Sequence, residues 1–114
     1  MRAALQQYLD GYNTRDPEKV LSLFADDAVV EDPFGSAPMA GRDAFAKFFT
    51  DAVTGGVDLA LDTPIRTSHG TAAAMAFTIS VGTLTIKAVD VMHFNDAGKI
   101  VHMQAFWGPS DMTT

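Results

Sequence analysis

The first part of the chain carries apolar residues at helical spacing. The i, i+3, i+4, i+7 pattern of an amphipathic helix is met by Leu5, Tyr8, Leu9 and Tyr12. Residues 13–15, Asn-Thr-Arg, interrupt this pattern. Asp16 and Pro17 then combine a capping carboxylate with a proline at the first helical position, which predicts a second, short helix. The buried side of that helix is expected at Val20, Leu21, Leu23 and Phe24.

A strand, a loop and a third helix are expected next. Residues 28–32 are short and β-branched, which predicts a strand, and Pro33 ends it while holding Asp32 in an extended conformation. Two glycines and two prolines between residues 33 and 41 predict a loop. The third helix is expected over residues 42–53, and its buried side would be formed by Phe45, Phe48, Phe49 and Ala52.

After Gly55-Gly56 the pattern changes from helical spacing to the alternation of strands. The expected strands cover residues 57–62, 65–68, 72–81, 84–94 and 99–107. Residues 95–98, Asn-Asp-Ala-Gly, predict a hairpin turn between the last two strands. Helices followed by antiparallel strands predict one α+β domain over residues 1–114, with three N-terminal helices packed on one face of a strongly curved, mostly antiparallel sheet.

Composition and charge narrow the range of partners. The formal net charge of −6 argues against nucleic acid and anionic membrane surfaces, and it is compatible with a neutral, apolar ligand. The absence of cysteine excludes disulfides, thiol catalysis and thiolate metal sites. The first residues lead directly into the helical pattern, and no apolar run approaches the ~20 residues of a membrane span. A cytoplasmic protein is therefore expected.

One expected strand places a single carboxyl group in an apolar row. Along residues 86–94, the residues on the same face as Asp90 are Ile86, Ala88, Met92 and Phe94. A buried carboxyl group without a partner is costly to ionise, so Asp90 is expected to stay protonated and to donate a hydrogen bond. The alternatives are a solvated Asp on an edge strand, or a buried Asp that accepts a hydrogen bond from a backbone N–H group.

The hairpin turn sets the expected pairing of the last two strands. If Asn95 pairs with Gly98, Asp90 lies opposite Met103. The inner face then continues through Val101, Met103, Ala105 and Trp107. The outer face would carry Val89, Val91, Ile100 and Phe106 beside His93, His102 and Gln104. A sheet face that is half apolar is unusual when it is open to water, which predicts a homodimer formed through the sheet.

Two further polar groups accompany apolar rows. Asp32 shares a strand face with Ala28 and Val30, although an Asp before proline is also a common turn element. Tyr8 lies in the middle of the first helical stripe, where a buried phenol must find a hydrogen-bond partner, and Tyr12 is a comparison of the same type one turn later. One ionised carboxylate and two donors in an apolar cavity suit proton abstraction next to a carbonyl group.

Other chemistries find little support in the sequence. His69, His93 and His102 lack the spacing of metal ligands, and the last two are expected to lie diagonally on the outer face of the hairpin. No glycine-rich stretch matches a phosphate-binding loop, and no serine stands in a G-x-S-x-G context. The sequence therefore predicts neither a cofactor nor a metal site.

Several segments together resemble bacterial steroid Δ5-isomerases (ketosteroid isomerases) over nearly the whole chain. The matching stretches are Gln7-Tyr8 and residues 24–35, 89–94 and 103–107. Ala25-Asp26-Asp27-Ala28 is shared widely in the NTF2-like, SnoaL-like superfamily of cone-shaped domains. The Glu-Asp-Pro-Phe-Gly segment of residues 31–35, the upstream Tyr8 and the Asp of Val89-Asp90-Val91-Met92 are more specific to the isomerases.

The resemblance implies a role for each matching residue. Asp32 would be the general base that moves a proton from C4 to C6 of a 3-oxo-Δ5-steroid. Tyr8 and Asp90 would hydrogen-bond the dienolate oxygen, the latter as a carboxylic acid kept neutral by its apolar site, as is known for that family. Trp107 would orient the Asp32 carboxylate. The apolar positions that would line the steroid pocket are Met75, Phe77 and Met103, and the family uses no cofactor or metal.

The chain also departs from that family. Phe24 and Phe49 stand where relatives can carry tyrosine, so the hydrogen-bond chain behind Tyr8 is expected to be shortened or absent and the rate to be lower. Two alternatives stay open. One is another enzyme of the same fold, similar to a polyketide cyclase or an epoxide hydrolase. The other is a non-catalytic module that binds a hydrophobic ligand.

Overall fold

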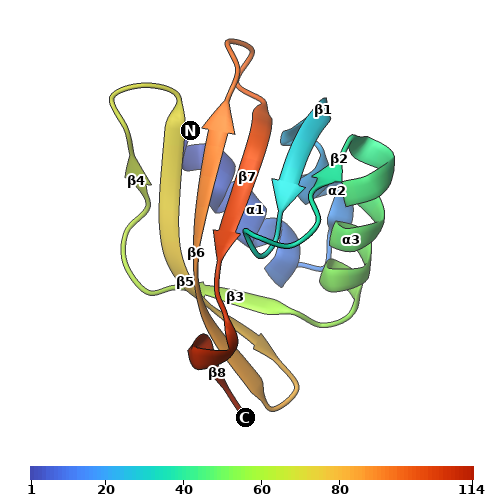
Figure 1. Ribbon diagram of the computed structural model, residues 1–114, viewed down its shortest axis with the longest axis vertical. Coiled ribbons are helices and arrows are strands. Elements are labelled where there is room, and N and C mark those ends of the chain that lie inside the picture. The colour runs from blue at the N-terminus through green and yellow to red at the C-terminus, as the bar shows by residue number, and fades with distance from the viewer.

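The computed structural model describes residues 1–114 and contains three α-helices packed on one open, mixed β-sheet (Figure 1). The helices are α1 (Arg2–Asn13), α2 (Pro17–Leu21) and α3 (Arg42–Thr54). The strands are β1 (Phe24–Glu31), β2 (Met39–Ala40), β3 (Asp58–Leu61), β4 (Arg66–Thr67), β5 (Ala72–Val81), β6 (Leu84–Phe94), β7 (Ile100–Phe106) and β8 (Met112–Thr113). None of the helices has both the length and the apolar character needed to cross a membrane. The α+β class predicted from the sequence is confirmed.

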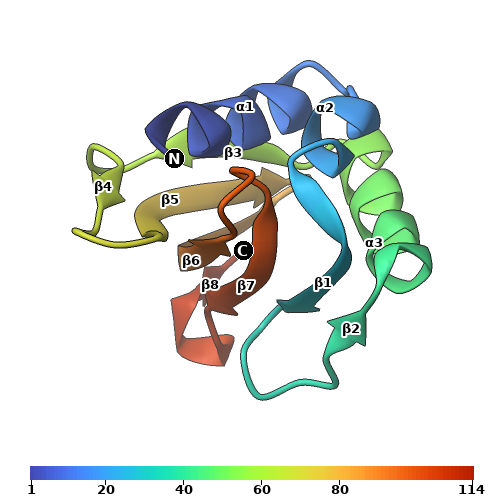
Figure 2. The same cartoon turned by 90° about the horizontal axis from the view of Figure 1, so that it is seen from above.

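The sheet wraps around the core instead of lying flat. Its strand order is β2-β1-β7-β6-β5-β3, with β4 paired to β5 and β8 paired to β6. β1 runs parallel to β7, and the other strand pairs are antiparallel. Seen from above, α1, α2 and α3 form an arc around the curled sheet (Figure 2). The buried apolar side chains form one cluster to which the helices and the sheet both contribute.

The alternation predicted for residues 84–94 is confirmed along β6. Buried and more accessible residues alternate along this strand, and the buried row consists of Ile86, Ala88, Asp90, Met92 and Phe94. β5 pairs with β6 over its full length, which places Met75 opposite Asp90. β6 therefore lies between β5 and β7, and Asp90 sits inside the sheet instead of at its edge.

The predicted register between β6 and β7 was wrong by two residues. The turn is one residue longer than expected, because the Asn95 N–H donates to the Lys99 carbonyl at 2.9 Å. Phe94 then pairs with Ile100 but His93 pairs with His102, which leaves Val101 as an extra residue in a β-bulge. A bulge changes the side-chain face of the residues before it, so Ile100 is fully buried instead of lying on the outer face.

The shift keeps Met103 and Ala105 on the inner face but moves them along the strand, and Ile100 is buried in place of Val101. Ala105 pairs with Asp90, and Met103 pairs with Met92. The two histidines lie directly opposite each other, not diagonally, with their ring centroids 5.6 Å apart. The loop length and the bulge could not be read from the turn residues alone.

The boundary between α2 and β1 also differs from the prediction. α2 ends at Leu21, and Phe24 begins β1 instead of closing the apolar side of the helix. Phe24 pairs with Ile100 of β7, and the pairing is irregular between Phe24 and Val29, where Asp26 and Asp27 are exposed. Phe24 is buried in either assignment, so burial alone did not distinguish a helix end from a strand start.

Candidate active site

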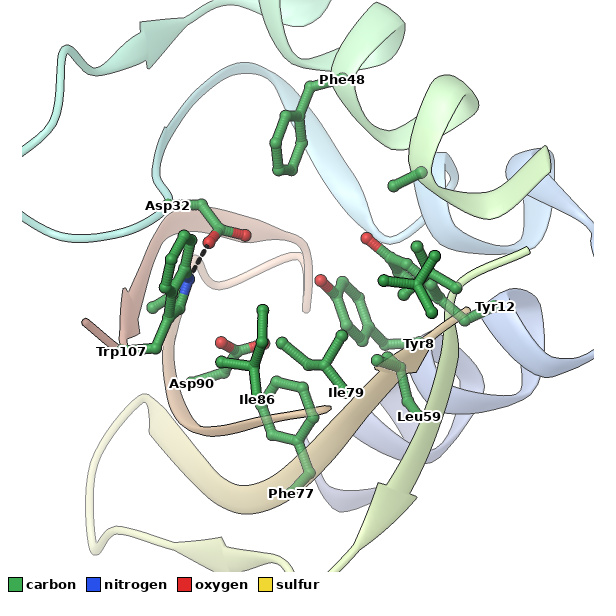
Figure 3. Close-up of a pocket in the computed structure, with 14 residues that line it drawn as sticks. Tyr8, Tyr12, Asp32, Phe48, Leu59, Phe77, Ile79, Ile86, Asp90 and Trp107 are labelled. Atoms are coloured by element: carbon green, nitrogen blue, oxygen red, sulfur yellow. Dashed lines mark hydrogen bonds between the residues drawn. The ribbon is translucent and has the colours of Figure 1, made fainter. Parts of the chain in front are cut away.

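An apolar pocket opens between α1, α3 and the concave side of the sheet (Figure 3). Its volume is about 630 Å³ when its open mouth is included. Asp32 and Asp90 are the two residues with an ionisable carboxyl group on its wall. The remaining lining residues are apolar or aromatic: Tyr8, Tyr12, Phe48, Ala52, Val57, Leu59, Phe77, Ile79, Val81, Ile86, Ala105 and Trp107. The fold thus brings two carboxyl groups into one apolar space.

Asp90 is a buried carboxyl group without a hydrogen-bond partner. It lies in the middle of β6, only 1% of it is exposed, and neither carboxyl oxygen has a partner. Burial raises the pKa of Asp90 well above its ordinary value, and the charge of Asp32 raises this pKa further. Both effects favour the neutral, protonated form of Asp90. Neither a solvated edge position nor a backbone hydrogen bond describes it.

Asp32 has a different environment at the end of β1. It is half-buried, and its Oδ1 accepts a hydrogen bond of 2.8 Å from Trp107 Nε1. Burial raises the pKa of Asp32, whereas the Trp107 hydrogen bond lowers it. Its second oxygen, Oδ2, accepts no hydrogen bond within the protein, and Figure 3 shows this carboxyl group at the pocket. Of the two carboxyl groups, Asp32 is the one equipped to ionise.

Two phenols occupy the α1 side of the pocket. Tyr8 and Tyr12 are one helical turn apart and are 2% and 4% exposed. Their ring centroids are 5.1 Å apart, and Figure 3 shows both hydroxyl groups directed into the pocket. Burial raises the pKa of Tyr8 well above its ordinary value, and Tyr12, Asp90 and Asp32 each raise it further. Burial thus favours the protonated forms of both Tyr8 and Asp90, in which each can donate a hydrogen bond.

The expected apolar lining is only partly on the pocket wall. Phe77 and Trp107 line the pocket. Met75 and Met103 are fully buried in the core and do not reach the wall. The shifted register accounts for Met103, because Ala105 occupies the place beside Asp90 that was expected for it.

Sequence reasoning missed other members of the site. Phe48 and Ala52 were expected on the buried side of the third helix, but they are half-buried and face the pocket, while Val53 is buried instead. Tyr12 was treated as a comparison and assigned no role. Its position four residues after Tyr8, in the same stripe, was the signal that could have placed it in the pocket.

The arrangement can hold a neutral molecule by its apolar surface and transfer protons at one end. The Asp32 carboxylate can accept a proton, and the protonated Tyr8 and Asp90 can donate hydrogen bonds to an oxygen atom. No group of three or more His, Cys, Asp or Glu side chains is placed to hold a metal ion. The polar chemistry of the pocket rests on four side chains, Tyr8, Tyr12, Asp32 and Asp90, together with the indole N–H of Trp107.

Comparisons with known proteins agree with this geometry. The SnoaL-like domain family matches residues 5–103. A steroid Δ-isomerase of Nocardioides simplex is 33% identical over 98% of this chain and 93% of its own length. The epoxide hydrolase LasB of Streptomyces lasalocidi is 30% identical over 92% of this chain, which spans only 40% of that enzyme.

A solved structure shares the whole architecture. It belongs to SalBIII, an epoxide hydrolase/cyclase-like enzyme described for pyran ring formation in the polyether salinomycin. The TM-score is 0.90 at 26% identity, and the alignment covers 98% of this chain and 93% of the SalBIII chain. The similar proteins thus include a steroid isomerase, an epoxide hydrolase and an epoxide hydrolase/cyclase-like enzyme. The chain belongs to the SnoaL-like (NTF2-like) family and is related to the steroid Δ-isomerases.

Proposed function

We propose that this protein is a steroid Δ-isomerase that converts 3-oxo-Δ5-steroids into conjugated 3-oxo-Δ4-steroids. The observation that carries the proposal is the contrast between the two carboxyl groups in one apolar pocket. Asp90 is buried without any partner, whereas Asp32 is held by Trp107 and has one free oxygen. This contrast supports an ionised base and a neutral acid that serve the same ketone.

In the proposed reaction, the ketone oxygen lies against Tyr8 and Asp90. Asp32 Oδ2 removes a proton from C4, the carbon between the carbonyl group and the double bond, and a dienolate forms. The two donors stabilise the negative charge on the dienolate oxygen, where it is largest. Asp32, now protonated, returns the same proton to C6, so the double bond moves into conjugation and the base is regenerated.

The hydrogen bond from Trp107 supports this shuttle. It occupies Oδ1 of Asp32 and leaves Oδ2 as the oxygen that takes and returns the proton. A fixed carboxylate can reach two carbons on the same face of a rigid substrate without reorientation of the whole side chain. The indole thereby acts as a positioning group for the base.

The pocket wall supports a substrate with a hydrocarbon body. Apart from the groups named above, the wall offers no polar partner to a ligand. A steroid, or another neutral β,γ-unsaturated ketone of similar size, buries apolar surface there without leaving an internal polar group unpaired. The similar enzyme of Nocardioides simplex is a steroid Δ-isomerase by name, which supports this proposal.

The direct test is the ultraviolet absorbance of the conjugated enone after a 3-oxo-Δ5-steroid is added. We expect turnover by the wild type and a loss of about 10²–10⁴-fold in Asp32→Asn, because the variant lacks a general base. Steroid binding by Asp32→Asn, measured with a non-reacting phenolic steroid, should persist. Near-full activity of Asp32→Asn would remove Asp32 as the base.

An epoxide-opening or cyclising activity is the second candidate, since LasB and SalBIII share this fold. The same groups could serve it, with Tyr8 or Asp90 protonating the epoxide oxygen and Asp32 activating an attacking hydroxyl group. Turnover of a hydrophobic epoxide without steroid isomerisation would favour this candidate. Binding of the phenolic steroid without any turnover would favour a non-catalytic module.

We further propose that two copies associate through the outer face of the sheet. Val89 and Phe106 pair across β6 and β7 and are 40% and 43% exposed. The Phe34 ring extends this apolar area, with its centroid 5.6 Å from that of Phe106. A second copy would cover an apolar surface that is otherwise open to water.

A further inference from the structure

The proposed reaction leaves one polar group of the pocket without a role, the phenol of Tyr12. Its side chain is buried on α1, yet its hydroxyl group is directed into the pocket beside that of Tyr8 (Figure 3). Among the residues that line the pocket, Tyr8 and Tyr12 are the only ones with a hydroxyl group. A phenol in such a place needs a hydrogen-bond partner, and the Tyr8 side chain is the partner that affects the pKa of Tyr12 through a hydrogen bond.

The two rings are packed against each other and against a third ring. Tyr8 and Tyr12 are four residues apart on one helix, with an angle of 43° between their ring planes. Phe49 of α3 packs edge-on against both rings, at centroid distances of 5.9 Å and 6.5 Å. Phe49 has no hydroxyl group, so α3 supplies an aromatic support there but no donor.

We propose that Tyr12 is a positioning residue for the oxyanion site, whose O–H donates to the Tyr8 oxygen while the Tyr8 O–H donates to the substrate oxygen. The inference rests on the proposed function. It differs from the sequence expectation that the hydrogen-bond chain behind Tyr8 is shortened or absent, because the donor behind Tyr8 comes from the same helix instead of from α3.

The chemistry of the two phenols supports this order. The Tyr8 oxygen carries one proton, and when this proton points to the substrate its lone pairs can accept from Tyr12. A donor behind Tyr8 polarises its O–H bond, so the two hydrogen bonds strengthen one another. Burial raises the pKa of Tyr12 and its hydrogen bond with Tyr8 lowers it; the net shift is upward, so Tyr12 keeps the proton that it must donate. Asp90 donates to the same substrate oxygen as Tyr8, so Asp90 does not compete with Tyr12 for the lone pairs of the Tyr8 oxygen.

The first test is a double-mutant cycle with Tyr8→Phe and Tyr12→Phe, which remove hydroxyl groups and keep both rings. Tyr12→Phe alone should lower kcat roughly five- to tenfold, the worth of one hydrogen bond, with little change in KM. In the Tyr8→Phe background the same substitution should have almost no effect, because its target is gone. An equal loss in both backgrounds would mean that Tyr12 acts on the substrate directly and would overturn the proposal.

The second test needs no turnover and therefore separates this inference from the proposed function. A phenolic steroid with a naphthol ring reports its own ionisation by absorbance when it is bound at the oxyanion site. Removing the Tyr12 donor should lower the ionised fraction of bound ligand, again severalfold, while thermal unfolding shows that the fold is kept. An unchanged ionised fraction in Tyr12→Phe, with Tyr8→Phe as the positive control, would refute the coupling.

The two experiments together give a decision in every case. If the wild type isomerises no steroid, the proposed function fails, and the ligand measurement still decides whether Tyr12 acts through Tyr8. If the wild type is active but Tyr12→Phe changes neither kcat nor the ionised fraction, the function stands and Tyr12 is only an aromatic core residue.

Discussion

The single hydrogen bond between Trp107 and Asp32 sets the acidic side of the pH profile. Burial raises the pKa of Asp32, and the Trp107 N–H opposes that shift because it favours the charged carboxylate. The proposed base works only when it is deprotonated, so kcat/KM should fall as the pH drops through the raised pKa of Asp32. Trp107→Phe keeps an aromatic ring and removes the N–H group. This variant should therefore move the acidic limb of kcat/KM to higher pH.

The measurement is kcat/KM for enone formation as a function of pH in the two proteins. Tyr8→Phe is the matched control, since it lowers the rate without removing a hydrogen bond from Asp32. The control should keep the wild-type position of the acidic limb. A limb that stays in place in Trp107→Phe, or moves to lower pH, would contradict the assignment of Asp32 as the titrating base.

Asp90 makes folding stability depend on pH in the opposite sense to a paired carboxylate. Its pKa in the folded state is raised, whereas the unfolded chain releases the proton near the ordinary value of about 3.9. Between these two values the folded state holds a proton that the unfolded state has lost. The free energy of unfolding therefore falls by up to roughly 1.4 kcal/mol for each pH unit gained in that window, and the fall ends above the folded-state pKa.

Asp90→Asn should remove this loss, because an amide does not ionise in the unfolded chain. We expect the variant to be more stable than the wild type at pH 8, and the difference to shrink as the pH approaches 4. Chemical denaturation of both proteins at several pH values measures this difference. A constant offset across the whole range would show that the side chain at position 90 acts by its shape and not by its proton.

The site residues were predictable from the sequence to the extent that a single residue broke an apolar pattern. Asp90 stood alone in a strand row, and Asp32 ended another, and the structure brings both to one pocket. Tyr12 broke the same helical stripe as Tyr8 but could not be told from a core aromatic. Which phenol hydroxyl reaches a cavity depends on α3 packing against α1, and a periodic pattern in one helix carries no information on that contact.

At the scale of whole elements, α1 depends on a glycine for its close approach to α2. Gly11 lies inside the helix, where alanine is normally favoured by about 1 kcal/mol. A Cβ atom at this position would lie 2.6 Å from Val20 Cγ2 and 3.2 Å from the Asp16 carbonyl oxygen. Val20 is fully buried and cannot move aside freely, so the steric term should exceed the helical preference.

Gly11→Ala should therefore destabilise the protein, by roughly 1–3 kcal/mol before the helical gain is subtracted. Gln6→Ala, on the exposed side of the same helix, is the control and should lie within about 0.5 kcal/mol of the wild type. Urea denaturation measures both. If Gly11→Ala proves more stable than the wild type, α1 and α2 are not packed as closely as described.

The same contrast between pattern and packing decided which elements could be predicted. β5, β6 and α3 have strong periodic patterns of ten or more residues, and their predicted bounds match within one residue. The predicted register of β6 against β7 was wrong because the turn and the bulge each contain one extra residue, and tertiary packing determines both. β2 and β8 are two-residue strands that exist only through their partners, β1 and β6, and short segments of this kind leave no pattern.

For the whole molecule, the outer sheet face is the surface that the fold leaves uncovered. Phe34, Val89 and Phe106 are exposed there, and the pairing of Val89 with Phe106 makes them neighbours. The sheet also carries the stacked pair His93 and His102, and the Glu31 carboxylate contacts His102. The net charge of −6 on each copy opposes association. The free energy gained by burying this apolar surface must therefore exceed the electrostatic repulsion between the copies.

Light scattering over a concentration series should give twice the mass of the chain for the wild type. The mass of the monomer should appear only at high dilution. Phe106→Glu places a charge where the second copy would bury an aromatic ring, and should weaken association at least roughly tenfold. Leu61→Glu is the matched control, since Leu61 is an exposed apolar residue on β3. The control should remain dimeric, because the added charge alone is not the cause of dissociation. A wild type that stays monomeric at the highest concentration would mean that this face meets water or a different partner.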